Sequence, residues 1–155
     1  MKVEQVPVTG REPKQPLTPQ MRALSEFYQA LNDRDMDLMA QNWAQTDKAV
    51  MDNPVGGIKR GWEEIRTVYE RIFNGSGHYW FEIHDYSYHE AGEIFYVVGR
   101  ERGEYRAGEA VLNIAIRTSR VFRRIDGAWR QVHHHGSIDD PELLAAYQQA
   151  VRSHV

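Results

Sequence analysis

Two side chains of this sequence could carry out acid–base chemistry if the fold brings them together: the phenol of Tyr28 and the carboxylate of Asp52. A carboxylate in an apolar cleft has its pKa raised, which suits it to act as a base near neutral pH. A phenol beside it can donate a hydrogen bond to an oxygen that becomes negative during the reaction. Tyr28 lies in an apolar stripe with helical spacing, and Asp52 ends a short strand pattern. We therefore expect both to line one apolar cavity.

Each of these residues also has a structural interpretation. A tyrosine at core spacing often only packs, with its hydroxyl group hydrogen-bonded. Asp52 directly precedes Asn53–Pro54, and an aspartate in that position commonly caps a turn.

Three consecutive histidines near the end of the chain are further candidates. In a strand, His133 and His135 share one face and His134 takes the other. At most His133 and His135 could bind one metal ion, and a third ligand would have to come from elsewhere, so we predict no metal site. The alternatives are a histidine-rich strand packed in the core or against a second subunit, and a role for His134 as a polar group of the pocket or as a general acid or base.

The elements that must position these residues begin with helices. Residues 1–17 contain three prolines among polar residues, which predicts a mobile N-terminal arm. Thr18–Pro19 is a typical helix start, and we expect Asp35 to cap a second helix. A strongly amphipathic third helix is expected over 62–73. Two tryptophans on these helices are expected in the core or in the pocket wall: Trp43 and Trp62.

The second half of the chain alternates with period two, which predicts strands over 79–84, 94–101, 112–122 and 129–138. In the third of these, the even positions are the more apolar, so we expect them to face inward, with Thr118 and Arg120 toward one end of the cleft. Helices followed by long antiparallel strands indicate an α+β fold: three N-terminal helices on a curved, mainly antiparallel sheet, and a short C-terminal helix. We expect one domain over 18–155.

Composition excludes several classes of function. A net charge of −3 without a clustered Lys/Arg face argues against nucleic-acid binding. The chain has no cysteine, so it has neither disulfides nor a thiolate nucleophile. No apolar run approaches the roughly 18 residues needed to span a bilayer, and no signal peptide is evident. We expect a cytoplasmic protein with no membrane partner.

The pattern as a whole resembles the nuclear transport factor 2-like (NTF2-like) superfamily, in particular its SnoaL-like and ketosteroid-isomerase-like branch, whose fold is a cystatin-like cone. The closing run also resembles the association domain of calmodulin-dependent kinases. The resemblance covers about residues 18–150. The resemblance rests on the following residues and motifs: Phe27–Tyr28, Asp33–x–Asp35, Trp43, Asp52–Asn53–Pro54–x–Gly56, Gly61–x–x–x–Ile65, Arg120–Val121–Phe122–Arg123–Arg124–x–Asp126–Gly127–x–Trp129 and Val132–His133–x–His135–x–Ser137.

The resemblance implies that Tyr28 donates to a developing oxyanion and that Asp52 moves the proton. The isomerases carry a second acid on the third long strand, where this chain has only Thr118, Ser119 and Arg120. Resemblance to the association domain makes Arg120 and Arg100 candidates for holding an anionic ligand. Arg120 could instead form a structural ion pair, and its possible partners are Glu101 and Glu109.

The expected activity is therefore proton transfer next to a carbonyl group of a small molecule, as in an isomerase, cyclase or dehydratase, without a cofactor. The alternative is a non-catalytic ligand-binding or oligomer-assembly domain. In either case we expect a homodimer through the open face of the sheet, which carries His133, His135 and Arg117.

Overall fold

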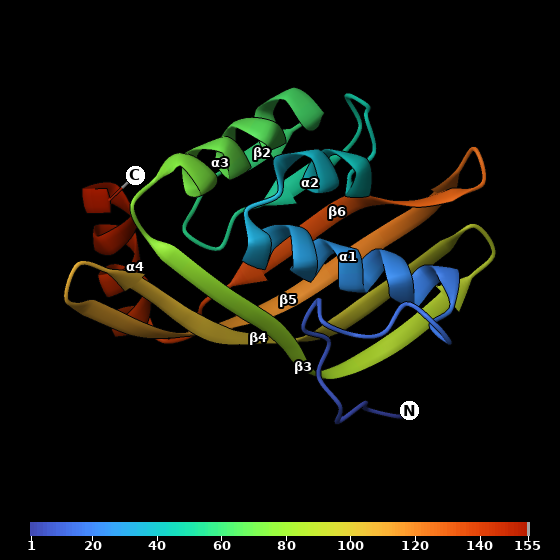
Figure 1. Ribbon diagram of the computed structural model, residues 1–155, viewed down its shortest axis with the longest axis horizontal. Coiled ribbons are helices and arrows are strands. Elements are labelled where there is room, and N and C mark those ends of the chain that lie inside the picture. Colours follow the sequence, from blue (N-terminus) through green and yellow to red (C-terminus); the bar gives the residue numbers. More distant parts are fainter. Residues whose placement is uncertain (155) are drawn as a thin grey trace.

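The computed structural model describes residues 1–154 as one six-stranded sheet with helices on one face (Figure 1). The predicted α+β architecture is confirmed: α1, α2 and α3 lie over the sheet, and α4 lies at one end of the long strands. None of the helices within 1–154 is long and apolar enough to cross a bilayer. The elements are α1 (Pro19–Asp33), α2 (Met36–Asn42), β1 (Val50–Asp52), β2 (Ile58–Arg60), α3 (Trp62–Asn74), β3 (His78–Ala91), β4 (Ile94–Ala107), β5 (Ala110–Ile125), β6 (Ala128–Ser137) and α4 (Pro141–His154).

The strand order is β2-β1-β6-β5-β4-β3, and only the β1–β6 pair is parallel among these neighbours. β3 is longer than the alternation pattern predicts because it continues through a bulge. Asp85 and Tyr86 together lie opposite Gly99, so β3 has one residue more than β4 at this point, and Asp85 has a positive φ of 48°. An extra residue shifts the alternation of inward and outward side chains by one position, so a strict period-two pattern does not predict the second half of β3. The bulge also bends the strand and helps the sheet curve.

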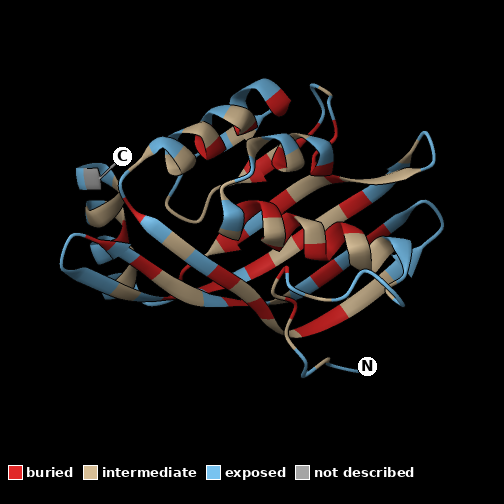
Figure 2. Cartoon of the chain, in the orientation of Figure 1, coloured by how far each residue is buried: buried red, intermediate tan, exposed pale blue. Residues whose placement is uncertain are grey.

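Buried and exposed positions alternate along the long strands (Figure 2). In β5 the even positions from Ile114 to Phe122 are all buried, as the sequence predicts. Both predicted helix caps also form: Thr18 accepts a hydrogen bond from the Met21 amide, and Asp35 accepts one from the Leu38 amide. These caps fix where α1 and α2 begin, and both helices lie over the same face of the sheet.

The segment ahead of α1, which the sequence predicts to be mobile, lies against β3 and α1 (Figure 1). Glu4 and Val8 form backbone bridges with β3, and the Val8 side chain is buried. The guanidinium group of Arg11 forms an ion pair with Asp33 at the end of α1. The arm therefore has contacts with the domain that its proline-rich composition does not predict.

Candidate functional site

A cavity of about 230 Å³ lies between the helices and the sheet. Its walls come from α1, α3, α4, all six strands and the turn between β1 and β2. Most of the lining is apolar, including Phe27, Met51 and Ile116, whereas the interior end carries three ionisable side chains: Glu101, Arg120 and His134. This combination of apolar walls and a few convergent polar groups is typical of a small-molecule site.

Arg120 and Glu101 form a buried ion pair at this end. The Arg120 guanidinium group donates to Glu101 Oε1 through Nη2 at 2.5 Å and through Nε at 3.2 Å. Tyr28 donates its hydroxyl proton to the same oxygen at 2.8 Å and accepts a hydrogen bond from Arg120 Nε at 3.3 Å. Burial and the Glu101 charge hold the pKa of Tyr28 well above its usual value, so the phenol stays protonated. The confirmed partner of Arg120 is thus Glu101, one of the two glutamates expected from the sequence.

The network continues away from the cavity into the core. Arg120 Nη1 donates to Gln131 Oε1 at 2.7 Å, and Gln131 donates to Asn42 at 3.2 Å. The guanidinium carbon lies 3.5 Å from the centroid of the Phe27 ring, a cation–π contact. Burial opposes the charge of Arg120, but Glu101 and Tyr28 outweigh it and raise the pKa of the guanidinium group. Arg120 is therefore a fixed, permanently positive part of the cavity wall.

His134 differs from its neighbours because its ring has no hydrogen-bond partner among the described residues. It is 4% exposed, it lines the cavity, and neither ring nitrogen is paired. Burial, followed by the positive charge of Arg120 and the adjacent histidines, lowers the pKa of His134 well below its ordinary value. At neutral pH the ring is neutral and offers one N–H donor and one unprotonated nitrogen.

Asp52 lies on the other face of the sheet from this cavity. In the parallel β1–β6 ladder, Met51 pairs with His134 and both are buried, whereas Asp52 pairs with His135. Asp52 Oδ2 lies 2.9 Å from His135 Nδ1, and Asp52 is not part of the cavity wall. The expectation that Tyr28 and Asp52 face one cavity is wrong. Tyr28 is buried behind the cavity wall rather than part of it, and Asp52 points away because the inward position of β1 is its neighbour, Met51.

The remaining predicted residues also fall outside the cavity. Arg100 is exposed, because the inward positions of β4 are the odd ones, such as Val97 and Glu101. Thr118 is buried on the helix-facing side of the sheet, but it is not part of the cavity wall. Trp43 and Trp62 are buried core residues, which is one of the two positions expected for them.

Glu101 is the acidic residue that the sequence interpretation did not assign to the site chemistry. It follows Phe95 and Val97 on the inward face of the same strand. A carboxylate at an inward position of an otherwise apolar pattern is rarely buried without a partner, and that signal could have identified it.

Comparison with known proteins places the chain in a family. A family model described as a SnoaL-like domain matches residues 21–141. The chain belongs to the SnoaL-like domain family. Its resemblance to the NTF2-like superfamily is thereby confirmed.

Solved structures similar to this SnoaL-like protein share its fold but differ in their descriptions. A candidate dehydratase of the NTF2-like family from Streptomyces avermitilis is 19% identical, with a TM-score of 0.68 over 74% of this chain and 90% of that one. A candidate calcium/calmodulin-dependent kinase II association domain from Thiobacillus denitrificans is 25% identical, with a TM-score of 0.65 over 83% and 100%. A candidate ketosteroid isomerase from Shewanella frigidimarina is 14% identical, with a TM-score of 0.63 over 77% and 95%.

One curated protein, F-box protein SKIP8 of Arabidopsis thaliana, is 24% identical over 123 residues. The match covers 77% of this chain and 51% of SKIP8, so the SnoaL-like chain spans about half the length of that relative.

Proposed function

We propose that this SnoaL-like protein binds a small, mostly apolar molecule with a carbonyl group in its cone and transfers a proton on that molecule through His134. The observation that carries the proposal is the unpaired ring of His134 in the cavity wall. A buried polar group without a partner is costly, and a ligand that supplies a hydrogen bond removes that cost.

The chemistry follows from the neutral state of the ring. The unprotonated nitrogen can accept a proton from the carbon next to a carbonyl group, as a general base. Because burial and the charge of Arg120 disfavour the imidazolium form, the ring readily returns the proton to another atom of the same molecule. The positive charge of Arg120 lies at the same end of the cavity and favours the enolate oxygen electrostatically. Isomerisation, cyclisation and dehydration all use such a step.

The size of the cavity limits the ligand. At about 230 Å³ it is smaller than the roughly 300–1,000 Å³ of pockets that bury drug-sized ligands, so a compact substrate fits better than a large polycyclic one.

The test is hydrogen–deuterium exchange at the carbons next to the carbonyl group of small cyclic ketones, followed by proton NMR in D₂O. We expect the protein to accelerate exchange on at least one of these ketones. We expect His134→Gln to lower the accelerated rate roughly 10²–10⁴-fold. His84→Gln is the matched control, because His84 lies on β3 outside the cavity and contacts Glu82. The proposal would be contradicted if exchange is no faster than in buffer for every ketone tested, or if the His134→Gln variant exchanges as fast as the native protein.

A second candidate function, assembly of two copies through the open face of the sheet, is favoured by exposed apolar side chains on that face. Tyr96 and Val98 of β4 are 38% and 43% exposed. Apolar groups gathered on a strand face commonly mark an interface. Light scattering with size-exclusion chromatography tests this: we expect a dimer that Val98→Glu converts to a monomer, and a monomeric native protein would refute it.

A further inference from the structure

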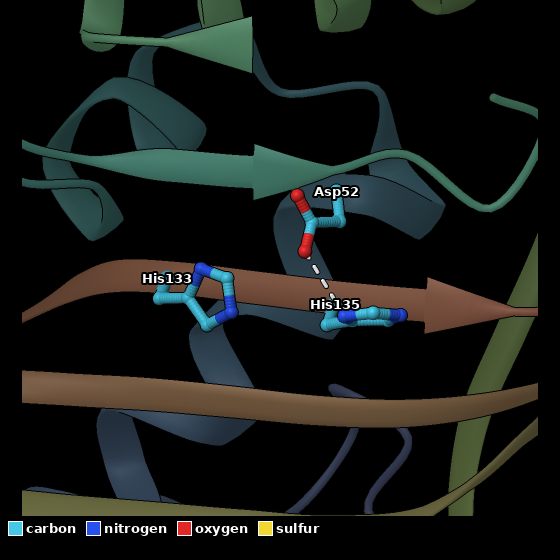
Figure 3. Close-up of side chains that lie close together, drawn as sticks. All are labelled: Asp52, His133 and His135. Atoms are coloured by element: carbon cyan, nitrogen blue, oxygen red, sulfur yellow. Dashed lines mark ion pairs between the residues drawn. The ribbon is translucent and has the colours of Figure 1, made fainter. Parts of the chain in front are cut away.

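The face of the sheet opposite the cavity brings three potential metal ligands together on β1 and β6 (Figure 3). One ligand atom each of Asp52, His133 and His135 lies within 4.8 Å of the other two. The closest contact joins Asp52 Oδ2 and His135 Nδ1 at 2.9 Å. The histidine run alone offers at most two ligands, which is why the sequence by itself predicts no metal site. Asp52 supplies the third ligand.

The ladder of β1 and β6 fixes this grouping. Asp52 pairs with His135, and Val50 pairs with His133, in parallel register. His133 and His135 are two residues apart in one strand, so both project to the same face, and Asp52 projects beside them from the neighbouring strand (Figure 3). The three side chains therefore stand on hydrogen-bonded backbone rather than on a loop.

The ring of His133 is already oriented for binding. Its Nδ1 lies 2.9 Å from the backbone carbonyl oxygen of Val50. A carbonyl oxygen can only accept, so Nδ1 carries the hydrogen and Nε2 of the neutral ring keeps its lone pair. Metal-binding histidines usually donate their second ring N–H in this way, which fixes both the tautomer and the ring direction.

The spacing suits a single ion. Zinc lies roughly 2.0–2.1 Å from histidine nitrogens and about 2.0–2.2 Å from carboxylate oxygens, so two ligands of one ion are about 3 Å apart. The Asp52–His135 contact already has that separation. The wider spacing within the group, at most 4.8 Å, closes with small side-chain rotations. Such rotations are possible because the His135 and Asp52 side chains are 55% and 30% exposed.

We propose that Asp52, His133 and His135 bind one divalent first-row transition-metal ion, zinc foremost, with at least one coordination position open to solvent. Two imidazoles and one carboxylate form a donor set that suits zinc and iron(II). The site is separate from the proposed proton-transfer function, because the three side chains lie across the sheet from His134.

A second histidine–carboxylate contact in the molecule provides the control. His84 Nε2 lies 2.9 Å from Glu82 Oε2, the same separation as in the Asp52–His135 pair. Within residues 1–154, this pair has no third histidine or carboxylate grouped with it as Asp52 and His135 have. A simple hydrogen-bonded pair and a three-ligand site can therefore be compared in one protein.

The experiment is isothermal titration of the full chain, free of any affinity tag, with zinc chloride. We expect one equivalent to bind, and Asp52→Asn, His133→Ala and His135→Ala each to weaken binding by at least about tenfold. His84→Ala should bind zinc as the native protein does. Circular dichroism shows whether each variant is folded. Because the His135 side chain is exposed to solvent, His135→Ala is the variant for which we expect the smallest effect on folding.

Cobalt(II) provides an independent measurement on the native protein. We expect an absorption band of cobalt bound to nitrogen and oxygen ligands, together with paramagnetic broadening of the His133 and His135 ring signals but not of the His84 signals. The proposal is overturned if neither metal binds saturably, or if the His84→Ala variant loses as much affinity as the three ligand variants.

Discussion

Arg120 and His134 are directly opposite each other in the β5–β6 ladder, and both are buried on the helix-facing side of the sheet. The guanidinium group is held by Glu101, Tyr28 and Gln131, whereas the imidazole ring has no partner. Burial, together with the positive charge of Arg120, lowers the pKa of this ring and keeps it neutral. The polar end of the cavity thus combines a buried ion pair, Arg120–Glu101, with one neutral group that can exchange a proton.

The low pKa of His134 predicts a stability that depends on pH. In the unfolded chain this histidine gains a proton as the pH falls below about 6.5, whereas in the folded protein it stays neutral to a lower pH. The unfolded state then binds more protons, so the free energy of unfolding falls with decreasing pH by up to about 1.4 kcal/mol per unit. Urea denaturation at a series of pH values from about 7.5 downward measures this slope. His134→Gln should have a shallower slope below about pH 6.5, and equal slopes would mean that folding does not lower the pKa of His134.

The buried ion pair predicts a large cost for neutralising one partner. Glu101→Gln leaves the charge of Arg120 buried without a counter-charge, and such a loss costs about 3–5 kcal/mol. Urea denaturation of the variant should show it as a lower midpoint. The matched control is Glu93→Gln, which removes the partner of Arg124 at the surface. The control should barely change the midpoint, and a similar loss in both variants would show that burial does not decide the effect.

Much of the fold follows from the sequence because its elements carry local signals. Thr18 and Asp35 mark helix starts through their own side chains, and β5 alternates over enough residues for its inward face to be assigned. The site is less predictable. Asp52 belongs to a strand of three residues, in which one step of register decides whether the carboxylate or Met51 faces the cavity. That choice depends on the long-range pairing with β6, which no local pattern contains.

The unpaired hydroxyl group of Thr118 predicts a stabilising substitution. Thr118 is 2% exposed, and its Oγ1 has no hydrogen-bond partner among the described residues. Thr118→Val replaces that hydroxyl with a methyl group of similar shape, which should raise the free energy of unfolding by roughly 1 kcal/mol. Thr118→Ser is the control, because it keeps the hydroxyl and loses the buried methyl group, and should destabilise by roughly 0.8 kcal/mol. Thermal unfolding shows whether each substitution raises or lowers the stability. A destabilised Thr118→Val variant would show that the Thr118 hydroxyl has a hydrogen-bond partner in solution.

Docking of the N-terminal segment depends on Gly10, which has a φ of 86° and lies against the backbone of Gln29 in α1. Gly10→Ala would both strain this backbone and push a methyl group into α1, so we expect the segment to detach. Gly92→Ala separates the two effects, because Gly92 has a φ of 59° but no atom near the added methyl group. Left-handed strain alone should cost about 1–2 kcal/mol in either variant. Limited trypsin proteolysis should then cleave after Arg11 and Lys14 faster in Gly10→Ala than in Gly92→Ala or the native chain. Equal cleavage in all three proteins would mean that the segment is already detached in solution, as its proline-rich composition predicts.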